Sequence, residues 1–119
     1  MYVESFKQLI VWQRSVELVK SVYTFTGELP REELYGLISQ MRRAAVSVPS
    51  NIAEGKKRKT RRDFIKFLRI ADGSAAELET QIILAKDLYP AINYSEAESL
   101  LEEVQKMLIV MIKKLNAKR

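Results

Sequence analysis

The stretch that decides the fold reads SQMRRAAVSVPSNIAEG over residues 39–55, KKRKTRR over 56–62 and DFIKFLR over 63–69. It joins two helical patterns through a turn that is almost wholly cationic. From Arg42 to Arg69, ten lysines and arginines stand against two acids, Glu54 and Asp63, whereas the whole chain has 20 bases and 15 acids. The positive charge is therefore concentrated in one patch, and we expect a binding surface there.

Length and composition favour one domain over residues 1–119, because 119 residues with 47% hydrophobic content are enough to build a core. The chain has no cysteine and no histidine, which excludes disulfides, thiolate nucleophiles, imidazole acid/base chemistry and most zinc or di-iron sites. We therefore expect no catalytic residues, no metal, no cofactor and no small-molecule substrate. The protein is predicted not to be an enzyme.

The N-terminus, MYVESFKQ, lacks the pattern of a secretory signal. The longest wholly apolar run, residues 107–112, is too short to cross a bilayer. These two features predict a soluble, cytoplasmic protein that does not insert into a membrane.

The first helix is predicted over residues 6–26, where apolar residues recur at alternating steps of three and four. Ser5 with Gln8 predicts a capping box at its start, and Gly27 predicts a left-handed stop at its end. The expected packing stripe is Leu9, Trp12, Val16, Val19 and Tyr23. A second stripe fits either a broad bundle core, which we favour, or a subunit interface: Val11, Leu18, Val22, Phe25 and Leu29.

The second helix is predicted from Pro30 to Gly55, with glutamates at 32 and 33 complementing the positive end of its dipole. The apolar phase is kept through Pro49, so we expect a continuous helix that is kinked where the proline ring presses on the carbonyl of Ala45. Its stripe is Leu34, Ile38, Met41, Ala45, Val48 and Ile52.

The third helix is predicted to be capped by Thr60 and to end at Leu88, and the fourth to begin at Ser95 with a capping box to Glu98. Small residues around Gly73 predict a close approach by a neighbouring helix. The third stripe is Phe64, Leu68, Ala71, Ala75, Leu78, Ile82 and Ala85. The fourth is Ala97, Leu101, Val104, Leu108, Met111 and Leu115.

No segment alternates with period two, so the sequence predicts an all-α fold, an antiparallel up-down-up-down four-helix bundle with short connections. In that order the start of the first helix, the turn between the second and third, and the end of the fourth meet at one end. This end gathers bases: Lys7, the run from Lys56 to Arg62, Lys113, Lys114, Lys118 and Arg119. The opposite end gathers acids: Glu28, Glu32, Glu33, Asp87, Glu96 and Glu98.

Clustered lysines and arginines from three segments favour a surface for phosphate, although a charge run taken alone is usually a solvated face. No base-reading motif is present, so binding to RNA or DNA is expected to follow shape and charge. An anionic membrane is a weaker candidate, because no large apolar residues interleave the run. The candidate nucleic-acid-binding residues are Lys56, Lys57, Arg58, Lys59, Arg61, Arg62, Lys66, Arg69, Lys113 and Lys114.

Arg42 flanks the second stripe, and the preferred interpretation is an ion pair with Glu79 on the third helix, with phosphate contact or a subunit interface as the alternatives. Glu54 lies at the wrong end of its helix for an anion and is expected to pair with Arg58 or Arg61. The polar group formed by Ser47, Ser50, Asn51 and Glu54 is a poor catalytic candidate, because the chain offers no histidine as a base.

The segments VWQRSVELV (11–19), LPREELYGLISQMRRAAVSVPSNIAEG (29–55), DFIKFLRIADGSAAELETQ (63–81) and LAKDL (84–88) closely resemble the bacterial four helix bundle protein family, also called 23S rRNA intervening-sequence protein or S23 ribosomal protein. The resemblance implies an antiparallel bundle, commonly assembled into a five-subunit ring and encoded in some species within insertions in the large-subunit rRNA gene. A related branch is similar to the accessory variability protein of diversity-generating retroelements, which associates with nucleic acid and a reverse transcriptase.

Two functional hypotheses follow. The first is a non-enzymatic homo-oligomer, a pentameric ring if it follows the family, that binds RNA or DNA through its basic end. The alternative is a homo-oligomeric protein-interaction scaffold whose basic turn only keeps it soluble. Assembly agrees with apolar residues outside the main stripe of the fourth helix: Leu100, Met107 and Val110.

Overall fold

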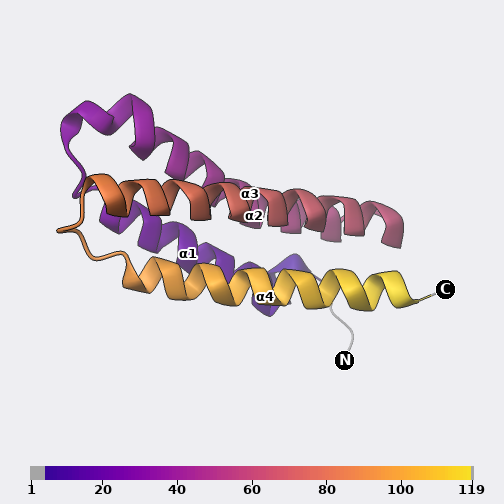
Figure 1. Cartoon of the computed structure of the whole chain (residues 1–119). Helices are drawn as coiled ribbons and strands as arrows, with labels where there is room; N and C mark the ends of the chain where they lie inside the picture. The colour runs from indigo at the N-terminus through magenta and orange to yellow at the C-terminus, as the bar shows by residue number, and fades with distance from the viewer. Residues whose placement is uncertain (1–4, 119) are drawn as a thin grey trace.

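The computed structural model describes residues 5–118, and every regular element within them is helical. Figure 1 shows four long antiparallel helices: α1 (Ile10–Thr26), α2 (Ser39–Lys56), α3 (Arg61–Leu88) and α4 (Ser95–Ala117). A 3-10 turn, η1 (Phe6–Gln8), precedes α1, whereas a 3-10 turn, η2 (Arg31–Glu33), and a π-helical turn, η3 (Leu34–Ile38), precede α2. The predicted all-α four-helix fold is confirmed.

The buried face of α1 is built on the second stripe, which confirms the favoured interpretation that this stripe belongs to the bundle core. The second stripe lies in the core, with Val11, Leu18, Val22, Phe25 and Leu29 at most 6% exposed. By contrast, the expected stripe is half-buried from residue 9 to 19 and ends at a Tyr23 that is 45% exposed. The core stripe also contains buried Ser15 and Thr26, whose hydroxyls donate to the carbonyls of Trp12 at 2.8 Å and Val22 at 2.6 Å. Since these bonds satisfy the hydroxyls, small polar residues can occupy core positions that a purely apolar pattern passes over.

The other three helices bury the predicted stripes over most of their length. Fully or nearly fully buried positions run from Ile38 to Ile52, from Leu68 to Ala85 and from Ala97 to Leu108. The ends of the stripes are more open, because Leu34 is 42% exposed and Phe64, Met111 and Leu115 are half-buried. The core therefore occupies the middle of the bundle and the acidic end.

The second helix begins later than predicted. Pro30 precedes η2, and the backbone at Gly36 is non-helical, with φ −113° and ψ −113°, so the regular helix starts only at Ser39. The carboxylate of Glu33 accepts from the backbone N–H of Leu37 at 3.2 Å and helps to hold this irregular entry. From Ser39 the helix continues through the buried Pro49, as expected, although a kink there stays a prediction.

Two of the expected helix caps are present. Ser5 and Gln8 form the predicted capping box, but it caps η1 and not α1 itself. The hydroxyl of Thr60 accepts from the backbone N–H of Asp63 at 3.1 Å and so caps α3. This cap fixes where the long third helix begins.

Two other predicted helix ends are wrong. The side chain of Ser95 does not cap α4, because its hydroxyl donates to Oδ1 of Asn93 at 2.7 Å, and the same oxygen accepts from the Ser95 N–H at 2.9 Å. The turn before the helix therefore occupies the group that would have made the box with Glu98. Gly27 has φ −65° and ψ −18°, an ordinary right-handed conformation, so no left-handed stop ends α1.

The small residues beside Gly73 pack against α2 as expected, because Oγ of Ser74 lies 2.8 Å from Oγ of Ser47, although Gly73 itself takes no part. A second close approach, which was not predicted, occurs at Gly55. A Cβ built on Gly55 would lie 2.7 Å from Cβ of Phe67 and 3.1 Å from Cδ1 of Phe64, so only glycine fits between α2 and α3 at this point. Gly73 is exposed, and a Cβ there would meet nothing within 4 Å. The helix also continues one residue beyond Gly55, to Lys56.

Tyrosine hydroxyls form hydrogen bonds that connect the elements at the acidic end of the bundle. Oη of Tyr89 donates to Oε2 of Glu33 at 2.7 Å, which raises the pKa of Tyr89 to about 12 and lowers the pKa of Glu33 below its ordinary value. Oη of Tyr94 donates to the carbonyls of Tyr89 at 2.9 Å and Ala85 at 3.2 Å, and its ring packs edge-on against Phe25. The α3–α4 connection is therefore fixed to both the end of α1 and the entry to α2.

Candidate nucleic-acid interface

The α2–α3 turn and the end of α4 meet at one end of the molecule. Nη1 of Arg61, at the start of α3, donates to the carbonyl of Lys118 at the end of α4, at 2.7 Å. A shallow hollow lies at the same junction and is lined by both segments: Arg61, Arg62, Ile65, Leu115, Asn116 and Lys118. Two of the three segments expected to converge are thus in direct contact.

This end extends beyond the first helix. The 17 residues of α1 span about 26 Å and the 28 residues of α3 about 42 Å at the usual helical rise, and Figure 1 shows α3 and α4 reaching past the beginning of α1. Lys7 belongs to η1, which packs against α2, and its place beside the other bases stays a prediction. Arg119 lies outside the described residues. We call the remaining group the basic tip: Lys56, Lys57, Arg58, Lys59, Arg61, Arg62, Lys66, Arg69, Lys113, Lys114 and Lys118.

The charges of the basic tip are exposed and mostly without an acidic partner. All ten candidate residues are exposed except Lys56, which is half-buried. Among the described residues, Arg58 alone of these ten forms an ion pair, with Oε2 of Glu54 at 2.8 Å, which confirms one of the two partners expected for that glutamate. The guanidinium of Arg58 also lies over the ring of Phe67, 4.7 Å from its centroid. The tip therefore presents a dense set of cations to solvent.

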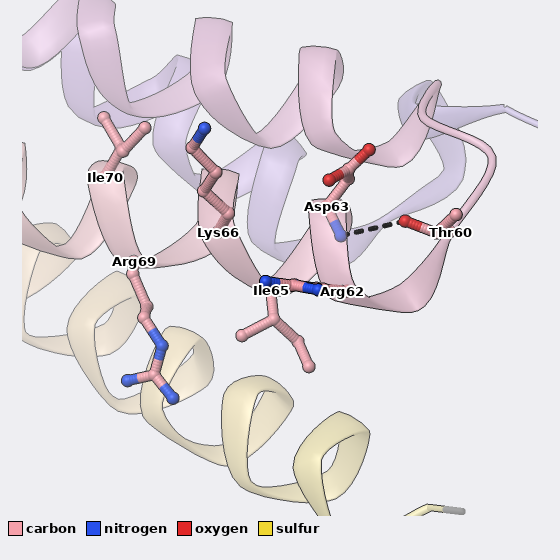
Figure 2. Close-up of a pocket in the computed structure, with 7 residues that line it drawn as sticks. All are labelled: Thr60, Arg62, Asp63, Ile65, Lys66, Arg69 and Ile70. Carbon is pink, nitrogen blue, oxygen red and sulfur yellow. Dashed lines mark hydrogen bonds between the residues drawn. The ribbon is translucent and has the colours of Figure 1, made fainter.

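A second hollow runs along the first turns of α3 (Figure 2), lined by Thr60, Arg62, Asp63, Ile65, Lys66, Arg69 and Ile70. Figure 2 shows the ammonium of Lys66 and the guanidinium of Arg69 directed to opposite sides of this hollow. Asp63 is the one carboxylate in the lining, and Ile70 is 43% exposed. The hollow therefore combines cations with aliphatic side chains. The charge pattern of the sequence did not predict the aliphatic part.

The predicted ion pair between Arg42 and Glu79 is wrong. Nε of Arg42 donates to Oγ1 of Thr26 at 2.9 Å, and its guanidinium lies 4.3 Å from the ring centroid of Tyr23. Arg42 thus faces the end of α1, whereas Oε1 of Glu79 accepts from Nε2 of Gln105 on α4 at 3.0 Å. Flanking positions on neighbouring helices did not predict the pairing, because the rotation of each helix decides which neighbour a flank faces.

Two of the polar residues around Pro49, Ser47 and Asn51, form hydrogen bonds within α2 and to α3. Oγ of Ser47 lies 2.8 Å from Oγ of Ser74 on α3, and Nδ2 of Asn51 donates to Oγ and to the carbonyl of Ser47 at 2.9 and 2.8 Å. Within residues 5–118 no cluster of three or more acidic, histidine or cysteine side chains is arranged to hold a metal ion. Over the same range no helix is long and apolar enough to span a membrane.

An apolar groove lies between the start of α1 and the second half of α4. Ile10 is 63% and Val110 is 48% exposed along it, and Met107 is half-buried. Leu100, expected outside the main stripe, is instead buried in the core at 9% exposure. The full lining is Gln8, Leu9, Ile10, Val11, Lys106, Met107, Val110 and Met111.

Comparisons with known proteins agree with this fold. The sequence profile of the family described as 23S rRNA-intervening sequence protein matches residues 7–110. A crystal structure from Bacteroides thetaiotaomicron VPI-5482, of a protein with unknown function from the S23 ribosomal protein family, is similar with a TM-score of 0.74 and 28% identity, covering 87% of this chain and 99% of that one. No curated protein matches the chain.

Neither of these two similarities bears on the accessory variability protein of diversity-generating retroelements, so that part of the resemblance stays a prediction. The profile match, by contrast, extends over most of the sequence, from η1 to the last turns of α4. The chain belongs to the 23S rRNA-intervening sequence protein family.

Proposed function

We propose that this protein is a non-enzymatic, homo-oligomeric helical bundle of the cytoplasm that binds the phosphate backbone of RNA or DNA through the basic tip. One observation carries the proposal: nine of the ten candidate cations have no ion-pair partner among the described residues. Like charges held together on one surface repel one another, and a polyanion relieves that repulsion while releasing its own counterions. Arginines at 61 and 62 add the planar fork that suits phosphate oxygens.

The family description gives a first ligand to test. It names a sequence that intervenes within 23S rRNA, and structured RNA is therefore the first probe. If about six phosphates of a duplex are neutralised, the logarithm of the binding constant falls against the logarithm of salt concentration with a slope near −5. Binding that does not weaken with salt would contradict a phosphate-based contact.

The apolar groove supports the homo-oligomeric part of the proposal. Exposed Ile10 and Val110 at its rims provide apolar surface that a second subunit can cover. A closed ring, of five subunits if it follows the resemblance, would bring several basic tips together and multiply weak phosphate contacts through avidity. The same groove also favours the second candidate function, a protein-interaction scaffold without a nucleic-acid role. Light scattering of the purified chain measures the subunit number.

A matched pair of variants tests the nucleic-acid role. The tip variant replaces Lys57, Lys59 and Arg62 by glutamine and leaves the Arg58 and Arg61 contacts intact. The control variant removes the same charge from exposed positions elsewhere, by glutamine at Lys20, Arg31 and Arg43. Fluorescence anisotropy with a labelled rRNA hairpin is expected to show about a tenfold or greater loss for the tip variant and little change for the control. Equal affinities for both variants, or no binding by the parent protein, would favour the scaffold.

A further inference from the structure

No aromatic ring within residues 56–69, the segment that carries most of the basic tip, is fully exposed. Single-stranded nucleic acids are commonly bound on exposed aromatic faces, each of which stabilises one stacked base. The tip contains two aromatic residues, Phe64 and Phe67, and both are half-buried against Gly55. The guanidinium of Arg58 lies over the ring of Phe67 at 4.7 Å. Among the tyrosines that the structure describes, the most exposed is Tyr35 at 92%, which belongs to η3 at the opposite end.

The cations of α3 form a rigid array. Arg62, Lys66 and Arg69 are exposed at positions i, i+4 and i+7 of one uninterrupted helix. Along the helix axis, the backbone of Lys66 lies about 6 Å and that of Arg69 about 10.5 Å from the backbone of Arg62. The Thr60 cap fixes the start of this helix. A fixed array of charges gains most from a ligand whose charges are already ordered, because a flexible strand must first lose conformational freedom.

The basic tip is built from two segments, which we call its arms: the α2–α3 turn with the start of α3, and the end of α4. Arg61 on α3 is bonded to the Lys118 carbonyl, which brings the end of α4 to the start of α3, and Lys113 and Lys114 belong to the last turns of α4. Two neighbouring cationic ridges suit two phosphate strands that border a groove. The hollow between the cations of α3 is lined by Ile65 and Ile70, which offer apolar contact to sugar edges but no ring for a base.

We infer that the basic tip recognises the paired backbone of a double-stranded nucleic acid and discriminates against unpaired strands, because its cations are carried by two helix ends and its two aromatic rings are half-buried, one of them beneath Arg58. This inference rests on the proposed nucleic-acid function and narrows its ligand to a duplex. RNA and DNA duplexes both present phosphates at regular spacing, and the test includes one duplex of each kind to distinguish them.

The test compares probes of equal nucleotide number bound to the full chain. They are a blunt 20-base-pair RNA duplex, a DNA duplex of the same sequence, and a 40-nucleotide polyuridine that has no stable pairing. At moderate salt we expect at least one duplex to bind about tenfold more tightly than polyuridine, with a steeper salt dependence. Polyuridine binding as tight as both duplexes would overturn the inference and leave the proposed function standing. No binding to any probe would overturn both.

Two variants test the role of the covered ring. Arg58→Ala uncovers Phe67, whereas Lys57→Ala removes one charge from the same turn without uncovering a ring. The readout is the ratio of duplex to polyuridine affinity, which cancels the general effect of a lost charge. We expect Arg58→Ala to lower this ratio by about fivefold or more and Lys57→Ala to leave it unchanged. An unchanged ratio in Arg58→Ala would overturn the part assigned to the covered ring.

Discussion

Arg61 and Lys118 lie 57 positions apart in the sequence, yet Nη1 of Arg61 donates to the Lys118 carbonyl at 2.7 Å. The bond ties the first turn of α3 to the end of α4. It therefore sets the charges of two distant segments on one surface, and the affinity of the basic tip for a polyanion is expected to depend on both.

Removing the α4 arm tests this dependence. The double variant Lys113→Gln, Lys114→Gln is expected to make the salt dependence of duplex binding less steep by about two, since each lysine that contacts a phosphate contributes about one. The melting temperature is expected to stay the same, because both side chains are exposed. Anisotropy titrations at several salt concentrations measure the slope. The pair Lys20→Gln, Arg43→Gln serves as the control, and an equal effect of both pairs would show that the α4 arm makes no specific contact.

Arg42 is expected to stabilise the junction of α1 and α2. Arg42→Ala removes the bond from Nε to Thr26 Oγ1 and the contact with the Tyr23 ring, so the free energy of unfolding should fall by about 1.5–3 kcal/mol. Urea denaturation measures the loss. In a double-mutant cycle with Thr26→Val the two changes are expected to be less than additive. A cycle with Glu79→Gln provides the control, and coupling there in place of Thr26 would contradict the geometry.

Two glycines are expected to respond oppositely to alanine. Gly55→Ala places a Cβ 2.7 Å from the Phe67 Cβ and should cost about 1–3 kcal/mol of stability through overpacking. Gly73→Ala places a Cβ where nothing lies within 4 Å, and should stabilise α3 by about 0.5–1 kcal/mol. Thermal denaturation of the two variants checks the signs. Stabilisation by both substitutions would show that the α2–α3 contact is not tight at Gly55.

The Tyr89–Glu33 hydrogen bond predicts a loss of stability in alkali. Because this bond raises the pKa of Tyr89 from 10.0 to about 12, the folded state holds the phenol proton more tightly than the unfolded state does. The resulting stabilisation is fully present below pH 10 and is lost as the pH rises from 10 to about 12. Urea midpoints measured across this range should fall more for the parent chain than for Tyr89→Phe. Parallel curves would show that the bond does not form in solution.

The same bond predicts a loss of stability in acid. The Tyr89 hydroxyl and, to a smaller extent, the Leu37 N–H hold the pKa of Glu33 below its ordinary value of 4.5. Stabilisation from Glu33 is therefore present above pH 4.5 and is lost as the pH falls through the lower folded pKa. Tyr89→Phe removes the larger of the two causes, so its urea midpoint should decline less below pH 4.5 than that of the parent chain.

The sequence correctly predicted which residues are buried in the helices that have a single apolar stripe. The positions from Leu68 to Ala85 are buried as expected, because no second stripe on α3 competes with them. On α1 two stripes fit the same period, and the choice depends on Ser15 and Thr26, whose hydroxyls are satisfied within the helix itself. The break at Gly36 was also not predicted, since the apolar period runs straight across it.

The candidate site could be predicted as a set of charges but not as a surface. Antiparallel order alone brought the end of α4 to the α2–α3 turn, which the bond between Arg61 and Lys118 bears out. The hollow beside Ile65 and Ile70 was not predicted, because both residues lie outside the packing stripe and single apolar residues there do not indicate a binding surface.

Most of the basic tip lies beyond the buried core: from Lys56 to Phe67 every residue is exposed or half-buried. Substitutions of its charged side chains therefore change ligand affinity with little effect on whether the bundle folds. Natural selection can thus diversify this end among related sequences while the remaining scaffold stays the same, and an engineer can graft a different recognition surface onto it without redesigning the interior.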